Sequence, residues 1–162
     1  MLIELPHAAG CLVCGRHNPH GLHLSLHVNV DDSTVTCAFT PQPHHVGFEG
    51  IVHGGLLATV VDEAMVWSAT WTGRLFCVCG EMSIRFRNRA RVGVPLIATA
   101  RIESARPKLI LASSTITAPD ATIIAQATGK YIPVSPDESR RMLDSLLPDP
   151  ATAQAAQLLR RV

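Results

Sequence analysis

The sequence predicts an α+β domain in which an antiparallel sheet packs over one long helix. Residues 56–72 contain neither Pro nor Gly and end before Gly73, which is typical of a helix. Apolar residues occur all round this helix, as in a helix buried on every side. A hairpin precedes the helix and a run of strand-like segments follows it. This order favours α+β architecture with a single layer of sheet on the helix.

The chain divides into three predicted parts. Residues 1–20 mix Pro, Gly, His and Cys without periodicity, which predicts an irregular lead-in segment. Residues 22–30 alternate apolar and polar side chains, which predicts a half-buried strand, and the predicted strands that follow are 34–39, 76–87, 96–104, 109–118 and 122–134. Residues 41–50 predict a loop. We therefore assign the lead-in to 1–20, the sheet-and-helix domain to 21–134 and a tail with one or two short helices to 135–162.

Composition excludes several classes of protein. The chain has 162 residues, a net charge of +1 and only 17% charged residues, so one well-buried domain is expected, with some surface covered by another subunit. No run of Lys or Arg exceeds two residues, so we expect no nucleic-acid partner. Acidic residues interrupt the longest apolar stretch and no signal peptide is evident, which predicts a cytoplasmic protein without membrane spans. The odd number of cysteines, five, predicts reduced thiols.

Two carboxylates, Asp62 and Glu63, lie inside the predicted helix among apolar residues. Ionised carboxylates in such surroundings carry a desolvation cost of several kcal/mol, roughly, unless a partner stabilises them. One interpretation is a functional site. The alternative is that a carboxylate reaches solvent or pairs with an arginine such as Arg85, Arg87 or Arg89.

The sequence His53-Gly54-Gly55 stands at the predicted start of this helix. Helix N-termini expose unpaired N–H groups and a partial positive charge, which suits anions and developing oxyanions. The alternative interpretation is a plain helix-entry turn. Asp62 lies about 11 to 12 Å further along the axis, at a rise of about 1.5 Å per residue, so one small reacting group cannot reach both within a single chain. A site shared between two subunits removes this difficulty.

The segment "GFEGIVHGGLLATVVDEAM" resembles the central-helix motif of hot-dog fold thioesterases, in the PaaI-like branch of the 4-hydroxybenzoyl-CoA thioesterase superfamily. The segments "CLVCGRHNPHGLHLSL" and "MSIRFRNRARVGVPLIATARI" are similar to further parts of that family, so the resemblance covers about residues 11–134. It implies a curved antiparallel sheet wrapped around one central helix. It also implies a homodimer whose sheets join and whose active sites lie at the subunit interface, or a homotetramer built as a dimer of dimers.

The resemblance implies a role for each motif residue. The Gly54 N–H would polarise a thioester carbonyl, and Asp62 of the other subunit would act as general base or nucleophile. His53 would shape the loop or touch the thioester, whereas Glu63 would be supporting or structural. No metal and no cofactor are expected, because a thioester has an electrophilic carbonyl and a good leaving group.

The expected substrate contacts include two departures from the family pattern. Gly47 stands where several members have Asn or Gln, and Cys79 stands where relatives often have Ser or Thr, whose hydroxyl hydrogen-bonds more strongly than a thiol. His45 is a candidate substitute for the missing polar group. The full set of expected contacts is Gly55, His45, Gly47, Glu63, Cys79, Arg87 and Arg89.

Two further patterns carry alternatives. Arg85, Arg87, Arg89 and Arg91 alternate at period two, which predicts either a solvated face or contacts to the phosphates of coenzyme A. Cys11, Cys14, His17 and His20 superficially resemble a zinc site, but only one Cys-x-x-Cys pair is present, so we prefer a lead-in loop packed near the site, with redox chemistry less favoured still. The histidines at 7, 23, 27 and 44 are expected on the surface.

These observations favour an acyl-CoA thioesterase. The alternative is a non-catalytic hot-dog protein that binds an acyl-CoA or another apolar ligand, which Gly47 and Cys79 make plausible. Hydration or dehydration of an acyl thioester is a third possibility, although the spacing associated with hydratases is not evident. The sequence does not indicate the acyl group.

Overall fold

The computed structural model describes residues 1–160, and the last two residues of the predicted tail lie outside the described residues. Within residues 1–160, seven strands form one antiparallel sheet with the order β1-β2-β3-β7-β8-β9-β6. The strands are β1 (Leu2–Glu4), β2 (His27–Asn29), β3 (Val35–Phe39), β6 (Cys77–Phe86), β7 (Leu96–Arg106), β8 (Leu109–Thr117) and β9 (Ile123–Pro133). A small separate sheet pairs β4 (Val46–Phe48) with β5 (Ile51–Val52). The helices are α1 (Gly54–Gly73), α2 (Pro136–Asp144) and α3 (Ala153–Leu159), with a 3-10 turn η1 (Pro43–His45).

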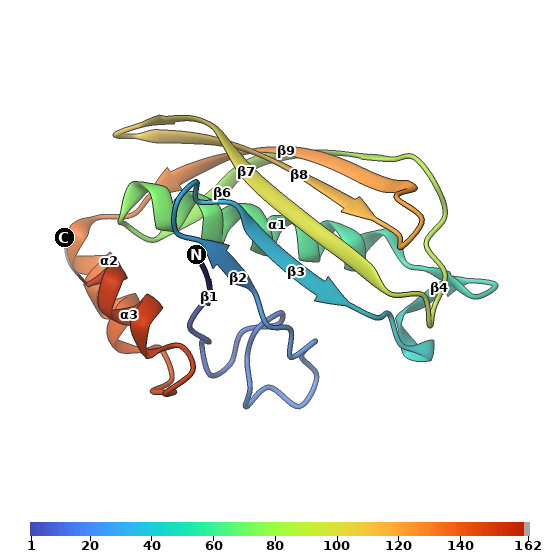
Figure 1. The fold of residues 1–162 in the computed structure, drawn as a ribbon, viewed down its shortest axis with the longest axis horizontal. Helices are drawn as coiled ribbons and strands as arrows, with labels where there is room; N and C mark the ends of the chain where they lie inside the picture. The colour runs from blue at the N-terminus through green and yellow to red at the C-terminus, as the bar shows by residue number, and fades with distance from the viewer. Residues whose placement is uncertain (161–162) are drawn as a thin grey trace.

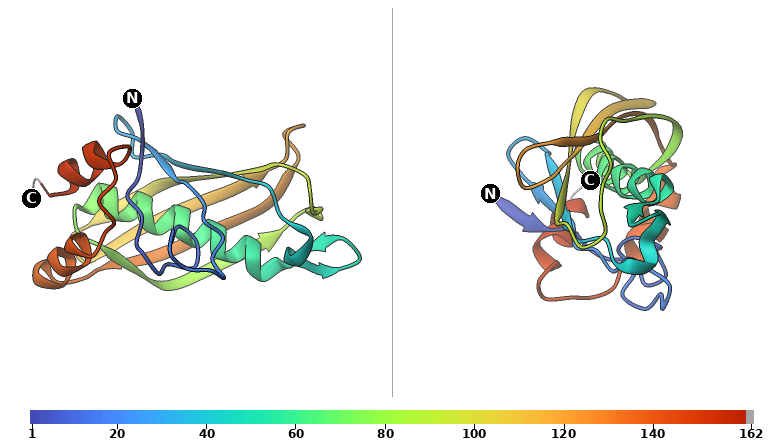
Figure 2. Two further views of the ribbon diagram at one scale, coloured as in Figure 1. Left: turned by 90° about the horizontal axis from the view of Figure 1, so that it is seen from below. Right: turned by 90° about the vertical axis from the view of Figure 1, so that its right-hand side faces the viewer.

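Helix α1 runs along the sheet, which wraps around it (Figure 1, Figure 2). It packs against β3, β6, β7, β8 and β9. Its second half is buried on more than one face, because its buried residues include Ala64, Met65, Trp67, Ser68, Ala69, Thr70 and Trp71. The predicted α+β fold with one enclosed central helix is confirmed.

The central strands show the period-two pattern on which the sequence prediction depends. In β8, buried residues alternate with partly exposed ones, since Ile110, Ala112, Ser114 and Ile116 face the core. The hairpin of β2 and β3 is also confirmed, with Val28 opposite Val35.

The predicted strand at residues 22–30 is wrong for its first half, since only residues 27–29 form β2. The N–H groups of Leu22 and Leu24 donate instead to the carbonyls of Leu12 and Val13, both at 2.8 Å. His23 has a positive φ of 52°, which interrupts the extended chain. The alternating side chains are therefore real, but their backbone partner is the Cys-x-x-Cys loop and not a strand.

The lead-in segment is more ordered than the sequence predicts. It begins with strand β1, which pairs with β2, and Leu5 and Cys14 join the main hydrophobic core. His7, expected on the surface, is only 1% exposed, so that expectation is wrong. Its Nε2 atom lies 3.1 Å from Glu4 Oε1 and 3.0 Å from Arg16 Nη2, which gives the buried ring polar partners.

The C-terminal tail, for which one or two short helices are predicted, forms two, and they lie beside the C-terminal end of α1 (Figure 1). The Ser139 hydroxyl of α2 accepts a hydrogen bond from the Phe76 N–H at 2.9 Å, and Leu143, Ala155 and Leu159 add side chains to the core. In the part of the chain that the structure describes, no helix has the length and apolar character needed to cross a membrane.

Strand β6 is one edge of the main sheet. It pairs with β9 on one side, and among residues 1–160 no strand pairs with its other side. Most of its side chains are exposed, and they include the apolar Val78 and Phe86. A ten-residue edge of this kind offers a row of free N–H and C=O groups for pairing.

Candidate active site

The start of α1 is built around His53, which is the residue that caps the helix. Its Nδ1 atom accepts a hydrogen bond from the Gly55 N–H at 2.9 Å, so the neighbouring nitrogen, Nε2, carries the proton of the neutral ring. Within residues 1–160, no protein acceptor engages the Gly54 N–H. Because helix N-termini concentrate partial positive charge, Gly54 presents the donor that an oxyanion requires.

Gly54 lines a cleft of about 740 Å³ together with three arginines, Arg87, Arg89 and Arg91. The ring of Phe86 lies over the glycine, and a Cβ atom there would meet it at 3.2 Å. Arg87 Nε donates to Gln126 Oε1 at 3.0 Å, whereas Arg89 is exposed. The structure thus brings Gly54, Arg87 and Arg89 to one cleft and places cationic groups beside the free N–H.

Asp62 is half-buried in the middle of α1, where a neutral donor holds it. The Tyr131 hydroxyl donates to Asp62 Oδ1 at 2.8 Å. None of the ion pairs among residues 1–160 involves Asp62 or Glu63, so the alternative of a pairing arginine is wrong. A carboxylate with a neutral hydrogen-bond donor and no cationic partner is the kind of group that can serve as a base.

Cys79 is the third member of the Asp62 cluster. It lies directly opposite Tyr131 in the pairing of β6 with β9, next to a register shift between Cys79 and Glu81. Burial and the neighbouring Asp62 carboxylate raise the pKa of the Cys79 thiol. The same two causes raise the pKa of Tyr131, so its phenol remains protonated and stays a donor.

The sequence interpretation missed Tyr131, the only tyrosine of the chain. Its ring lies over Gly129, two residues earlier on the same face of β9, where a Cβ atom would approach Tyr131 Cε2 to 2.6 Å. Gly129 therefore gives the ring the space to lie along the strand and reach Asp62. A Gly two residues before a buried Tyr in a strand is the signal that was present in the sequence.

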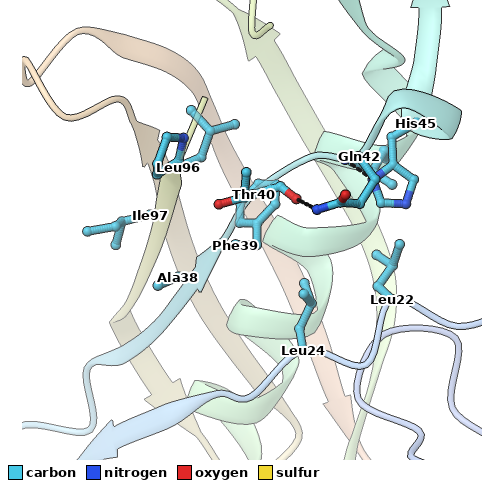
Figure 3. Close-up of a pocket in the computed structure, with 11 residues that line it drawn as sticks. Leu22, Leu24, Ala38, Phe39, Thr40, Gln42, His45, Leu96 and Ile97 are labelled. Atoms are coloured by element: carbon cyan, nitrogen blue, oxygen red, sulfur yellow. Dashed lines mark hydrogen bonds between the residues drawn. The ribbon is translucent and has the colours of Figure 1, made fainter. Parts of the chain in front are cut away.

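His45, Gly47 and Gly55 gather around His53 and not around Asp62. The His53 N–H donates to the His45 carbonyl at 2.9 Å, and Gly47 packs so closely that a Cβ atom would lie 3.0 Å from His53 Cα. The His45 ring lines a separate apolar pocket of about 510 Å³, where its Nδ1 accepts from the Gln42 N–H at 2.9 Å (Figure 3). These residues shape the helix entry.

Glu63 points to a different part of the molecule. Trp67 Nε1 donates to Glu63 Oε1 at 3.0 Å, and the Cys11 thiol of the lead-in segment lies 3.7 Å from the same oxygen. Burial raises the pKa of Glu63 to about 7. Glu63 is thus held away from the other candidate substrate contacts.

Within one chain the candidate residues form two separate groups, one around Gly54 and one around Asp62. Gly54 and Asp62 are eight residues apart in α1. At a rise of about 1.5 Å per residue they are separated by about 12 Å along the axis. A single thioester carbonyl and the water or carboxylate that attacks it need a much shorter distance, near 3 Å.

Comparison with protein families finds one similar family over the middle of the chain. Residues 49–125 match the model of a family described as the thioesterase superfamily, and this range includes the start of α1, Asp62, Cys79 and the arginines. The match covers just under half of the chain and shows its similarity to the thioesterase superfamily, and the sheet with its central helix has the hot-dog fold.

Its curated relatives include acyl-coenzyme A thioesterase THEM4 of Bos taurus, 24% identical over 120 residues, which are 74% of this chain and 49% of the relative. The THEM4 of Xenopus laevis is 25% identical over 122 residues, with 72% and 52% covered. The chain therefore spans about half the length of the curated relatives it matches.

Solved structures share the same fold. A thioesterase superfamily protein, RHA08564, has a TM-score of 0.70 at 22% identity, with 76% of this chain and 60% of that chain covered. A Streptococcus mutans protein solved with bound acetyl CoA has a TM-score of 0.64 at 19% identity, covering 69% and 89%. Thioesterase superfamily member 2 of Mus musculus has a TM-score of 0.58 at 26% identity, covering 64% and 83%.

Replacing Tyr131 with Phe should lower the free energy of unfolding by about 1–3 kcal/mol, because the half-buried Asp62 carboxylate loses its donor while the ring keeps its packing. Urea unfolding of the wild type and the variant measures this difference. Ser113→Ala is the matched control, since its hydroxyl also donates to a carboxylate but on the exposed face of β8. Its cost should stay within about 0.5 kcal/mol. Equal losses of unfolding free energy in both variants would show that the hydrogen bond from Tyr131 to Asp62 contributes no more than an exposed one.

Proposed function

We propose that this protein hydrolyses acyl-CoA thioesters at sites formed between two subunits. The observation that carries the proposal is the Asp62 carboxylate, half-buried in α1, held by Tyr131 and without a cationic partner among residues 1–160. The match of residues 49–125 to the thioesterase superfamily model supports the reaction class. The acyl-CoA thioesterase names of the curated relatives support the substrate class.

The chemistry needs few groups because a thioester is already reactive. Asp62 of one subunit removes a proton from water or attacks the carbonyl itself, and the Gly54 N–H of the other subunit stabilises the oxyanion. A donor of this kind contributes about 10² to 10³ in rate, and a positioned base contributes about 10² to 10⁴. His53 fixes the loop that presents Gly54, and Cys79 contributes a weak hydrogen-bonding group beside Asp62.

The subunit arrangement follows from the unpaired edge of the sheet. Strand β6 carries Cys79 and ends at Phe86, directly before the arginines of the Gly54 cleft. Pairing of β6 with β6 of a second copy would extend the sheet and cover Val78 and Phe86, which are exposed in one chain. The same pairing would bring the Asp62 cluster of one subunit towards the Gly54 cleft of the other. We propose a homodimer of this type, with a dimer of dimers as a further step.

The coenzyme A moiety is proposed to lie over the Gly54 cleft. Arginine guanidinium groups suit phosphate because they donate two parallel hydrogen bonds, and Arg87 and Arg89 line this cleft. The acetyl CoA bound to the Streptococcus mutans neighbour supports a coenzyme A ligand.

A binding protein without catalysis is the second candidate. Gly47 favours it, since the close approach to His53 leaves no room for a polar side chain at the position where active members of the family often have Asn or Gln. In that case acyl-CoA would stabilise the protein against heat without release of free coenzyme A.

Replacing Asp62 with Asn should lower kcat by about 10² to 10⁴, because the amide cannot accept a proton or attack the carbonyl. The assay measures release of the coenzyme A thiol from short, long and aromatic acyl-CoAs. Asp137→Asn in α2, an exposed carboxylate that pairs with Arg140, is the control and should leave kcat unchanged. Circular dichroism checks that both variants fold. Equal turnover by Asp62→Asn and the wild type would remove Asp62 from the mechanism, and no turnover of any substrate by the wild type would favour the binding protein.

Replacing Arg87 and Arg89 with Gln should raise KM for acyl-CoA by about tenfold or more with little change in kcat, since charge-assisted hydrogen bonds to phosphate are lost. The same acyl group on pantetheine lacks the nucleotide phosphates and should show no change in KM. Arg140→Gln, on α2, serves as the control for loss of a surface charge. A rise in KM for both thioesters would mean that the arginines do not contact phosphate.

A further inference from the structure

A cluster of three metal-ligating side chains lies outside the proposed catalytic site. Cys11 and Cys14 come from the lead-in segment and Glu63 comes from α1, and their ligand atoms all lie within 4.8 Å of one another. The Cys14 side chain is buried, and the other two residues are partly buried. The proposed hydrolysis uses none of these three groups.

The loop from Cys11 to Gly15 is shaped to bring the two sulfur atoms together. The Val13 N–H donates to Cys11 Sγ at 3.3 Å, and the Gly15 N–H donates to the Cys11 carbonyl at 3.1 Å. A Cβ atom at residue 15 would lie 2.3 Å from that carbonyl oxygen and 2.5 Å from the Cys11 nitrogen, so only glycine allows this closure. N–H groups that point at a sulfur atom stabilise its thiolate form, which is the form that binds metals.

The third group, Glu63, lies at a distance from the Cys11 sulfur that suits two ligand atoms of one metal ion. Cys11 Sγ lies 3.7 Å from Glu63 Oε1 and 3.9 Å from Oε2. Bond lengths of about 2.3 Å for Zn–S and 2.1 Å for Zn–O at a tetrahedral angle give a sulfur–oxygen separation of about 3.6 Å. Trp67 Nε1 donates to Glu63 Oε1, which orients the carboxylate as outer-shell donors do in metal sites.

The Glu63 carboxylate and the two neighbouring thiols are groups that suit a cationic partner. None of the ion pairs among residues 1–160 includes Glu63, although the carboxylate is largely removed from water. The Cys11 sulfur, which accepts from the Val13 N–H at 3.3 Å, lies beside this carboxylate. A cation between these groups would compensate for the desolvation of both.

We propose that Cys11, Cys14 and Glu63 bind one Zn²⁺ ion, with a solvent molecule completing the tetrahedron. Two thiolates select a soft or borderline metal, and the carboxylate favours zinc over copper(I), which prefers sulfur ligands. The ion would tie the lead-in segment to α1 at the residue that follows Asp62. The spacing in the sequence also suggests His17 and His20 as ligands, but the cluster does not include them.

The test measures zinc binding alone, on the full chain and without an activity assay. Reduced protein is titrated with Zn²⁺ against a chromogenic chelator, and bound metal is counted by mass spectrometry. The wild type should bind one Zn²⁺ per chain. Cys11→Ser and Glu63→Gln should weaken binding by about 100-fold or more, because each removes a ligand, whereas outer-shell changes cost about 10- to 100-fold. Cys79→Ser, which removes the exposed thiol on β6, should bind zinc as the wild type does.

Glu63→Gln preserves the volume of the side chain and still accepts from Trp67, so it keeps the test valid if a cysteine variant fails to fold. Substitution with Co²⁺ should give a thiolate-to-cobalt charge-transfer absorption in the wild type, and this absorption should be weaker in Cys11→Ser, which keeps only the Cys14 thiolate. Equal zinc affinity in Glu63→Gln and the wild type would overturn the site. A reduced wild-type chain that takes up no zinc would also overturn it. This holds even if Cys11 and Cys14 form a disulfide once the reductant is removed.

Discussion

The fixed rise of helix α1 is the constraint on which the site depends. Gly54 begins the helix and Asp62 lies eight residues later, so about 12 Å of rigid backbone separates the proposed oxyanion donor from the carboxylate. The sheet that wraps around α1 leaves no freedom to bend the helix and shorten this distance. A reaction that uses both groups therefore needs a second copy of the chain. The exposed edge of β6 offers the surface on which that copy can pair.

Neutral donors replace cations around the carboxylates of α1. Tyr131 donates to Asp62, and Trp67 donates to Glu63. An arginine in either place would form an ion pair, whereas a phenol or an indole donates a hydrogen bond without adding a positive charge. The two adjacent acids nevertheless face different parts of the molecule. Asp62 meets Cys79 and the sheet, while Glu63 meets the cysteines of the lead-in segment.

The sequence predicted the helix and the long strands because their signals are local. Gly73 ends α1, and alternation along residues 109–118 marks β8. The partner of Asp62 was not predictable in this way, since Tyr131 is 69 residues away and meets it only where α1 packs against β9. The first half of the predicted strand at 22–30 failed for a related reason. Apolar and polar side chains do alternate there, but the backbone hydrogen-bonds to an irregular loop, which has no periodic pattern in the sequence.

The cross-subunit claim can be tested by mixing two inactive variants. Asp62→Asn lacks the base, and Gly54→Pro lacks the N–H at the first position of a helix, where proline is tolerated. His53 is extended, with φ −61° and ψ 130°, as a residue before proline requires. Neither variant alone should release coenzyme A from acyl-CoA.

After unfolding and refolding together in equal amounts, half of the dimers should carry one intact site, which restores about a quarter of the wild-type turnover. Recovery near that level is the result we expect. A mixture that stays as inactive as its two components would contradict a site shared between subunits.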